Sequence, residues 1–207
     1  MAEKRMPIME YNPMEETILT AAFEVVDRET LNGTRMRLIA EEAGVVQSNL
    51  HYYFKTKRDL LLALLRYIQK NFSEKREAVL NQHSNSLADK LAGFFEQKKQ
   101  IIEEEPQYDR TQFDYWCMGR VDPEINEEFY QSYEIWRKHI AETIRLYDPA
   151  VEAETAALLA HIMVSMMMGE SLQVLNSKLT VDLDLYASLC CDMLMEYLHT
   201  APSTVQA

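Results

Sequence analysis

The sequence predicts an all-α protein: a three-helix helix-turn-helix head followed by a larger C-terminal helical bundle, about nine helices in all. Two observations carry this prediction. The 207 residues include only 5 Gly and 6 Pro, whereas a sheet protein of this length usually needs more turn residues. Apolar residues also recur at the spacing of an amphipathic helix along most of the chain. Hydrophobic residues make up 47% of the sequence, which is an ordinary globular composition.

The first helix of the head has a clear start signal. Asn12 followed by Pro13 is typical of an N-cap and a first helical residue. Apolar residues continue at helical spacing from Ile18 onward, and the helix should end before Gly33, which can adopt a positive φ. Thr34 is then placed to cap a second, short helix.

The second helix should end at Gly44, and the third should cover about two turns between Val45 and Phe54. A connection of about three residues around Gly44 has the length that helix-turn-helix units use. Thr56 can cap a long, leucine-rich fourth helix, in which Asp59 stands at the N3 position. A carboxylate there suits the positive end of the helix dipole.

The rest of the chain continues in helical period, which breaks at Pro106 and Pro149, and Asp122-Pro123 begins a new helix. The expected helical segments are residues 86–102, 109–120, 123–144, 151–175 and 183–198. We expect a head over residues 1–55 that begins with a flexible arm at 1–11, a body over residues 56–200, and a flexible tail at 201–207.

The charge is distributed unevenly along the chain. The net charge is −12, which by itself argues against a nucleic-acid partner. Residues 28–70, however, contain eight basic and four acidic residues, whereas residues 71–207 contain eleven basic and twenty-three acidic residues. An acidic body repels DNA, so any DNA contact should be confined to the locally basic segment.

The cysteines and the hydropathy indicate a soluble, cytoplasmic protein. Cys117, Cys190 and Cys191 form no C-x-x-C motif, and we expect them to be buried, reduced thiols. No N-terminal apolar stretch resembles a signal peptide. We find no run of about 18 apolar residues that would span a membrane, so no membrane partner is expected.

The block from Thr34 to Leu60 reads TRMRLIAEEAGVVQSNLHYYFKTKRDL. It resembles the DNA-binding head of the TetR repressor family in its Thr, its Ile-Ala and Ala-Gly-Val turn, its Leu followed by His and aromatic residues, and its Phe and Lys-x-Lys. The resemblance covers roughly residues 14–68, a third of the chain. Val46 departs from the pattern, because the family often has a capping Ser or Thr there. The stretch from Trp116 to Gly169 is loosely similar to the choline-sensing repressors.

The resemblance implies that the third helix enters the major groove of double-stranded operator DNA. Its first residues are short and polar, as base edges require, and Gln or Asn can bond adenine with two hydrogen bonds. The aromatic residues and the flanking basic residues suit phosphates. The alternative is that the polar residues are only the solvent-exposed start of a helix. The aromatic residues would then cover the edge of the head's core. The expected DNA contacts are Thr34, Arg35, Gln47, Ser48, Asn49, His51, Tyr52, Tyr53, Lys55 and Lys57.

Aromatic and methionine residues form stripes in the body that could line a cavity for a small-molecule effector, although ordinary core packing is the alternative. Glu170 lies in an apolar stretch and could meet a cationic ligand, solvent or a dimer partner. The expected ligand-binding residues are Phe94, Phe113, Trp116, Tyr133, Trp136, Met163, Met167 and Glu170. The histidines show no metal-binding spacing and no catalytic motif is present, so we expect no cofactor and no enzyme activity.

The last two predicted helices are apolar on broad faces, which suits a two-fold dimer through residues 151–175 and 183–198. The combined prediction is a dimeric, ligand-responsive transcriptional regulator, a repressor that an apolar or amphipathic effector releases from a palindromic operator. Two alternatives stay open. One is a DNA-binding regulator without a ligand, and the other is a helical carrier or enzyme with a vestigial head.

Overall fold

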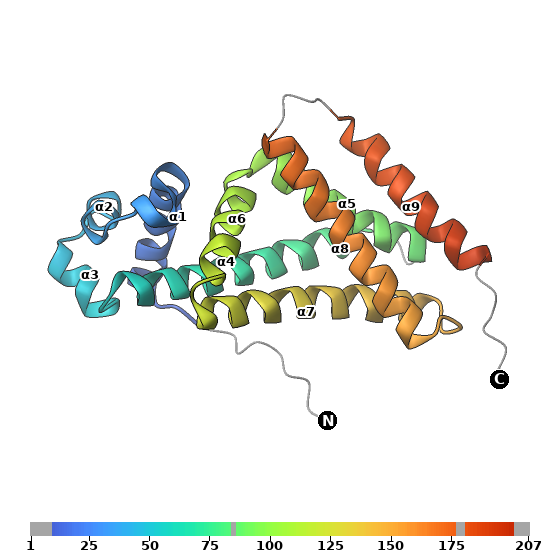
Figure 1. Cartoon of the computed structure of the whole chain (residues 1–207), viewed down its shortest axis with the longest axis horizontal. Helices are drawn as coiled ribbons and strands as arrows, with labels where there is room; N and C mark the ends of the chain where they lie inside the picture. Colours follow the sequence, from blue (N-terminus) through green and yellow to red (C-terminus); the bar gives the residue numbers. More distant parts are fainter. Residues whose placement is uncertain (1–9, 84–85, 177–180, 201–207) are drawn as a thin grey trace. The chain divides into compact units, whose positions relative to one another are not determined.

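The computed structural model describes residues 10–83, 86–176 and 181–200. The residues described form nine helices and no strand, as the sequence predicted (Figure 1). The helices are α1 (Pro13–Gly33), α2 (Met36–Glu42), α3 (Gln47–Tyr53), α4 (Lys57–Leu80), α5 (Leu87–Glu104), α6 (Gln107–Gly119), α7 (Pro123–Tyr147), α8 (Ala153–Asn176) and α9 (Leu183–Thr200).

The chain divides into two compact units. Unit 1 comprises the residues up to Ser73 together with Arg110–Phe129, and unit 2 comprises Glu74–Asp109 together with the residues from Tyr130 onward. Helices α4, α6 and α7 therefore each contribute residues to both units. This division differs from the expected boundary after residue 55, because side chains of α6 and α7 bond to the helices of the head.

The start of α1 follows the sequence signal. The Asn12 side chain accepts hydrogen bonds from the backbone N–H groups of Met14 and Glu15, at 3.0 Å each, and Glu15 accepts in return from the Asn12 N–H. This reciprocal capping box satisfies donors that the first turn leaves open. The expected arm at 1–11 lies mostly outside the described residues. Tyr11 is described, and its hydroxyl donates to the Ala63 carbonyl at 3.1 Å.

The end of α1 corrects the expected role of Thr34. Its side chain is buried, and its hydroxyl donates to the Thr30 carbonyl at 2.7 Å, so Thr34 closes α1 while Arg35 stands at the N-cap of α2. Thr30 itself has φ 62° and ψ 167°, a backbone conformation that costs free energy for a residue with a Cβ. The neighbouring Leu31 N–H donates to Asp114 of α6 at 3.1 Å, which helps to hold this conformation.

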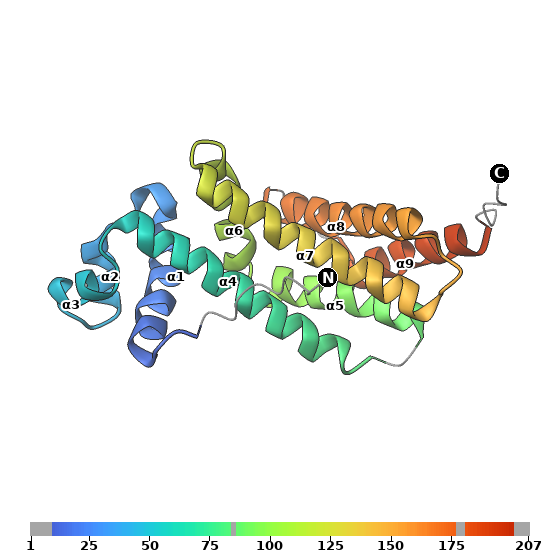
Figure 2. The same ribbon diagram turned by 90° about the horizontal axis from the view of Figure 1, so that it is seen from below.

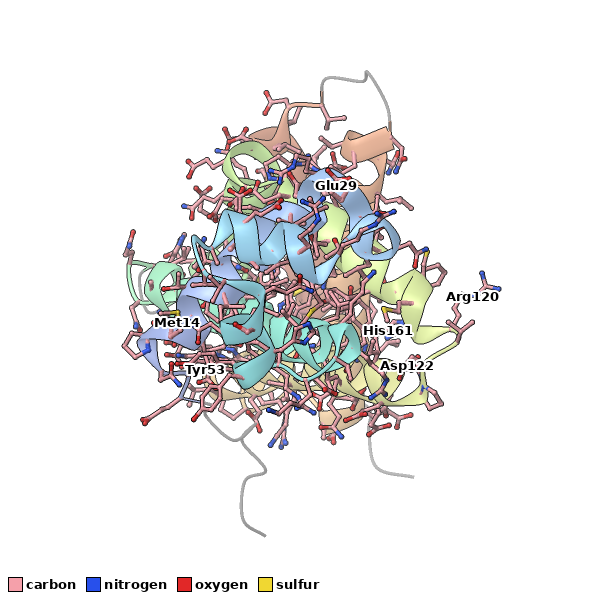
Figure 3. The ribbon with its side chains drawn as sticks, turned by 90° about the vertical axis from the view of Figure 1, so that its left-hand side faces the viewer. Met14, Glu29, Tyr53, Arg120, Asp122 and His161 are labelled. Atoms are coloured by element: carbon pink, nitrogen blue, oxygen red, sulfur yellow. The ribbon has the colours of Figure 1, made fainter. Side chains whose placement is uncertain are left out.

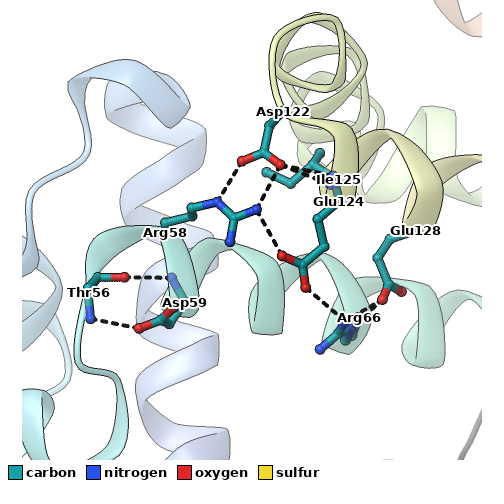
Figure 4. Close-up of polar contacts among 8 residues, drawn as sticks. All are labelled: Thr56, Arg58, Asp59, Arg66, Asp122, Glu124, Ile125 and Glu128. Atoms are coloured by element: carbon teal, nitrogen blue, oxygen red, sulfur yellow. Dashed lines mark hydrogen bonds and ion pairs between the residues drawn. The ribbon is translucent and has the colours of Figure 1, made fainter.

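Two arginines of α4 pair within unit 1 with carboxylates at the start of α7 and immediately before it. Arg58 of α4 donates to both oxygens of Asp122, at 2.7 and 2.9 Å, and to Glu124 at 2.8 Å (Figure 4). The figure also shows Arg66 bonded to Glu128, one helical turn further along α7. The bidentate geometry fixes the start of α7 against α4.

A second ion pair of unit 1 joins α6 to α1. Arg110 donates to both carboxylate oxygens of Asp27, at 2.7 and 3.0 Å. The Tyr115 side chain, on the same helix, is fully buried, and its hydroxyl donates to the Leu61 carbonyl at 2.6 Å. These contacts explain why α6 residues belong to the same compact unit as the head.

We expect the Arg58 pair to stabilise the protein in a pH-dependent way. Hydrogen bonds from Arg58 lower the pKa of the Asp122 carboxyl. A lowered folded-state pKa means that the pair stabilises the fold above the unfolded value of about 3.9, and that this contribution is lost as pH falls through the folded-state value. Arg58→Met should therefore lower the urea midpoint near neutral pH, and the difference from the wild type should shrink by about pH 3.

The matched control for this prediction is Arg120→Met, because Arg120 is exposed in the same unit (Figure 3). It should leave the urea midpoint nearly unchanged at both pH values, as most exposed substitutions do. An Arg58→Met deficit that stays constant between the two pH values would show that lost packing, and not the ion pair, causes the effect.

Unit 2 has its core between α5, α8 and α9, with α7 contributing Ile140 and Ile144 (Figure 2). Helix α8 is long and apolar enough to cross a membrane by length and composition, contrary to the expectation from the sequence. Its inner residues are buried against α5 and α9, and 39% of its most apolar window is buried. Those residues include Ala156, Leu159, Ala160, Met163 and Met167.

The interior of unit 2 also contains an ion pair. Lys98 of α5 donates to Asp109 of α6 at 2.5 Å, and both side chains are almost completely buried. Burial lowers the pKa of Lys98, and the negative charge of Asp109 opposes this effect. Since Arg110 pairs with Asp27 in unit 1, two adjacent residues of α6 are anchored in different units. The expected tail at 201–207 lies outside the described residues.

Candidate DNA-binding and effector sites

The helix-turn-helix is built around a short turn between α2 and α3. Gly44 has φ 66°, the left-handed region that favours glycine, and ends α2 as the sequence predicted. Ile39 and Leu50 are fully buried and Phe54 nearly so, which fixes α3 against the head. Figure 3 looks toward the helices of the head and labels Tyr53 at the end of α3. The outer residues of α3 are thereby held on a rigid support.

The exposed side of α3 carries most of the predicted DNA-reading residues. Gln47 and Ser48 are exposed, and Asn49 is half-buried. The Gln47 amide nitrogen lies 3.4 Å from His51 Nε2, and His51 Nδ1 lies 3.3 Å from the Lys55 carbonyl. The tautomer with a proton on Nδ1 satisfies both contacts, because His51 then donates to Lys55 and accepts from Gln47. Gln47 keeps one N–H and its carbonyl oxygen available to a base.

Aromatic and basic groups surround this row. The rings of Tyr52 and Tyr53 are perpendicular with centroids 5.1 Å apart, and Tyr52 is 72% exposed. Lys55 Nζ lies 5.8 Å from the centre of the Tyr52 ring. Together with the exposed Arg35, these groups offer hydroxyl and cationic donors of the kind that contact phosphates.

Two predicted contacts of the head, Thr34 and Lys57, need revision or qualification, whereas the missing cap at Val46 is confirmed. Thr34 is buried and bonded to Thr30, so its hydroxyl does not face a phosphate. Lys57 is half-buried and donates to the Asn32 carbonyl at 3.1 Å; burial, and to a smaller extent Arg35, lowers its pKa. Val46 stands at the N-cap of α3 without a side-chain hydrogen bond, as the sequence predicted, and is 69% exposed.

The basic segment offers DNA fewer free charges than its sequence indicates. Arg58 and Arg66, two of its eight basic residues, pair with carboxylates of α7. Arg28 pairs with Glu42 and Arg37 with Glu41. The positive charge near α3 is therefore concentrated at Arg35, Lys55 and Lys57, of which Lys57 already donates to the Asn32 carbonyl.

Six of the predicted effector-site residues belong to unit 2. Phe94, Met163 and Met167 lie in the core cluster, and Tyr133 and Trp136 pack against it with ring centres 6.0 Å apart. Burial raises the pKa of Tyr133. Glu170 is 4% exposed, its Oε1 has no hydrogen-bond partner, and desolvation raises its pKa.

The other two predicted effector-site residues belong to unit 1. Phe113 is half-buried. Trp116 is 58% exposed, so its ring does not line an apolar interior as its expected place in the effector site would require. Cys117 beside it is also exposed, whereas Cys190 and Cys191 are buried as expected. This part of α6 turns its inner side toward the head through Tyr115, which leaves Trp116 facing outward.

Unit 2 contains a layer of buried polar side chains that was not predicted from the sequence. Arg76 is 7% exposed, its guanidinium lies 5.8 Å from the Trp136 ring, and burial lowers its pKa to about 10. Gln97 is 3% exposed on the inner side of α5. The sequence contains a pattern that indicates this layer, because Gln97 and Lys98 stand at helical spacing from the core residues Phe94 and Ile101. Among the residues that the structure describes, no cluster of His, Cys, Asp and Glu is arranged to hold a metal.

Comparison with known proteins identifies the family of the N-terminal head. Residues 18–64 match the model for bacterial regulatory proteins of the tetR family. Residues 18–64 therefore form a DNA-binding head of the TetR family. The transcriptional regulator RutR of Escherichia coli strain K12 is 44% identical over 54 residues, which span 26% of each chain. The match thus covers about a quarter of that relative's own length.

Solved structures extend the similarity to the whole fold. A protein of Saccharomonospora viridis in complex with choline has a TM-score of 0.74 and 23% identity, over 90% of this chain and 96% of that one. The multidrug binding protein EbrR complexed with imidazole has a TM-score of 0.65 and 20% identity, over 89% and 96% of the two chains. At these identities the likeness establishes the all-α TetR fold of head and body and no more.

Proposed function

We propose that this TetR-family protein is a ligand-responsive transcriptional repressor that binds a palindromic operator as a dimer. The exposed row on α3 carries this proposal. Gln47, Ser48 and Asn49 are presented on a helix whose opposite side is fixed by Leu50. Helices of this kind read base edges in the major groove, and the two-fold symmetry of a dimer matches the symmetry of a palindrome. The role is regulatory and not catalytic, and we place the protein in the cytoplasm, with DNA.

The proposed base reader is Gln47, because His51 orients its amide before DNA binds. An oriented Gln amide can donate to N7 and accept from N6 of adenine. Tyr52, Tyr53, Lys55 and Arg35 then contact the phosphates on either side. The revised head gives Thr34 only a structural role.

We expect Gln47→Ala to weaken binding to the preferred operator and to relax the base preference at one position. The operator is first selected from random duplexes with the full chain. Loss of a base contact typically costs about 1–3 kcal/mol of discrimination, or about 5- to 150-fold in relative affinity. His51→Ala should lose part of the same preference, because it removes the support of the Gln47 amide.

Lys55→Ala is the matched control for Gln47→Ala. It should weaken all duplexes alike and reduce the slope of log affinity against log salt by about one unit. If Gln47→Ala instead lowers affinity equally for every duplex, Gln47 contacts only the backbone and the proposed reading is wrong.

The proposed dimer surface is formed by exposed apolar residues of α8 and α9, within residues 151–175 and 183–198. On α9 these residues recur every four positions, so they form one continuous stripe. Large exposed apolar stripes usually mark contacts between proteins, and two α8–α9 pairs would bury each other in a bundle. The stripe residues are Leu158 and Leu172 of α8 and Leu185, Leu189, Met193 and Tyr197 of α9.

The proposed effector is a small, largely apolar or amphipathic molecule that binds inside unit 2. The clustered Phe94, Tyr133, Trp136, Met163 and Met167 support this, since aromatic and methionine side chains adapt to varied ligands. Two proteins of the same fold have been crystallised with small molecules, choline and imidazole. Effector and operator should then oppose each other reciprocally, typically by about 1–3 kcal/mol.

A further inference from the structure

The interior of unit 2 contains two buried hydrogen-bond donors that lack acceptors. Gln97 Nε2 and Trp136 Nε1 have no hydrogen-bond partner among the residues described, although Gln97 is only 3% exposed. The Trp136 indole nitrogen can only donate, and so can the Gln97 amide nitrogen. Buried donors in native proteins nearly always have an acceptor, so each such case calls for an explanation.

The register of α5 against α7 places the two donors at the same level. The Phe94 ring lies 5.5 Å from the His139 ring. One turn further along α5, Lys98 bonds to Asp109, whose charge acts on Tyr133. Helices α5 and α7 are therefore antiparallel, so residues later in α5 lie level with residues earlier in α7.

Gln97 follows Phe94 by three positions, and Trp136 precedes His139 by three positions. In two antiparallel helices matched at Phe94 and His139, these residues face the same level of the interior. The two unpartnered donors thus form one donor pair and not two unrelated defects.

One buried cation lies at this level. The Arg76 guanidinium lies 5.8 Å from the Trp136 ring centre, and the charge of the exposed Glu77 beside it in the sequence acts on it. Burial and the nearby Arg76 charge lower the pKa of His139, so that ring is neutral near pH 7. Lys98 and Asp109 offset each other as a direct pair. The level therefore combines the two unpartnered donors of Gln97 and Trp136 with the buried charge of Arg76.

We infer that the effector of this protein carries an acceptor-rich anionic group, a carboxylate, that binds between Gln97, Trp136 and Arg76. Its apolar part lies against Phe94 and Met163. The inference rests on the proposed function, because it assumes that the effector enters unit 2. A carboxylate accepts several hydrogen bonds at once and pairs with a guanidinium, and such charge-assisted bonds are the strong ones.

Glu170 does not direct the choice toward a cation. It lies beside Tyr186 and Cys190 of α9, on whose pKa values its charge acts. Its own pKa is raised by desolvation, so it can become neutral by taking up a proton. Arg76, in contrast, keeps its charge at pH 7 even with a pKa of about 10. A cation at the level of Trp136 would be repelled by that charge.

The test uses three probes of matched shape: 4-phenylbutanoate, 4-phenylbutylammonium and 4-phenylbutanol. The full chain carries Trp116→Phe, which leaves Trp136 as its one tryptophan and removes only an exposed ring. Binding is followed by Trp136 fluorescence and by the indole N–H resonance. We expect phenylbutanoate to give a saturable change and a shifted indole resonance, and the ammonium probe to give neither.

Gln97→Met keeps the size of the side chain and removes its donor. It should weaken phenylbutanoate about 10- to 100-fold, the effect of losing a hydrogen bond to a charged group, and should leave phenylbutanol nearly unchanged. Gln97→Glu should weaken the carboxylate further by repulsion. Gln100→Met on the same helix is the matched control, since Gln100 bonds to Glu96 and should leave all three affinities as they are. Thermal melts establish that each variant is folded.

The outcomes separate this inference from the proposed function. Tighter binding of the ammonium, or phenylbutanoate binding that is indifferent to Gln97→Met, overturns the carboxylate while an effector site in unit 2 stands. Absence of phenylbutanoate binding also overturns it. The proposed function is tested separately with the same Trp116→Phe protein. Its binding to the operator is measured first, and then its release from the operator by whichever probe binds.

Discussion

Leu189→Arg should convert the protein to monomers and reduce its operator affinity by about two orders of magnitude or more. Leu189 is 54% exposed in the middle of the stripe on α9, between Leu185 and Met193. In the proposed dimer an arginine there would be taken out of water without a carboxylate partner, which is costly. A monomer engages half-sites singly and loses the gain of a linked second site, which is typically 10²–10⁴-fold.

The measurements are sedimentation of the free protein and titration of the selected operator. Leu146→Arg is the matched control, because Leu146 is 74% exposed at the end of α7 and lies outside the proposed interface. It should remain dimeric and keep its operator affinity. If Leu189→Arg also stays dimeric, the interface lies elsewhere; if it becomes monomeric with unchanged operator affinity, binding does not need the dimer.

The helices of the head could be predicted because their signals are local. Asn12 with Glu15 and Thr56 with Asp59 each form reciprocal caps from residues three positions apart. Gly44 takes the positive φ that the turn requires. Interactions over a few residues depend little on the rest of the fold, so the sequence is sufficient to identify them.

The candidate sites were less predictable, because their environment depends on contacts distant in sequence. Arg58 pairs with Asp122, 64 positions later, so its charge is committed before DNA arrives. Trp116 belongs to an apolar stripe, but Tyr115 is the residue that turns inward to bond Leu61. Helical periodicity predicts which residues of α6 share a face, but it does not predict which face is buried against another helix.

Thr34 illustrates a competition between two local roles. A Thr immediately before a helix normally caps it, and the sequence therefore predicts that Thr34 caps the second helix. The positive φ at Thr30 instead brings its carbonyl to the Thr34 hydroxyl, while Asp114 of α6 accepts from Leu31. A contact between residues 83 positions apart thus lies beside this cap, and periodicity and propensity do not reveal such a contact.

The buried Lys98–Asp109 pair should have the largest single effect on stability. Lys98→Met would leave the Asp109 carboxylate buried without its cation, which typically costs about 3–5 kcal/mol of unfolding free energy. Asp109→Leu should cost a similar amount by leaving the Lys98 ammonium alone. Urea unfolding of the full chain, followed by circular dichroism, measures both losses.

The two single variants should respond to pH in opposite directions. A lone buried lysine releases its proton more readily in the folded state, so the unfolded chain binds more protons and stability rises with pH. A lone buried carboxylate holds its proton more readily in the folded state, so stability falls as pH rises. Asp109→Leu should therefore gain stability between about pH 6 and pH 9, and Lys98→Met should not.

The double variant Lys98→Met/Asp109→Leu should recover most of the lost stability, within about 1 kcal/mol of the wild type, because no charge is left in the interior. Lys138→Met is the control, since Lys138 and Glu142 are both 59% exposed at 3.5 Å and such pairs contribute about 0–1 kcal/mol. If the double variant is as unstable as either single one, the loss comes from packing at the α5–α6 contact. If the double variant recovers stability, and the stabilities of the two single variants change with pH in opposite directions, the loss in each single variant comes from an unpaired buried charge.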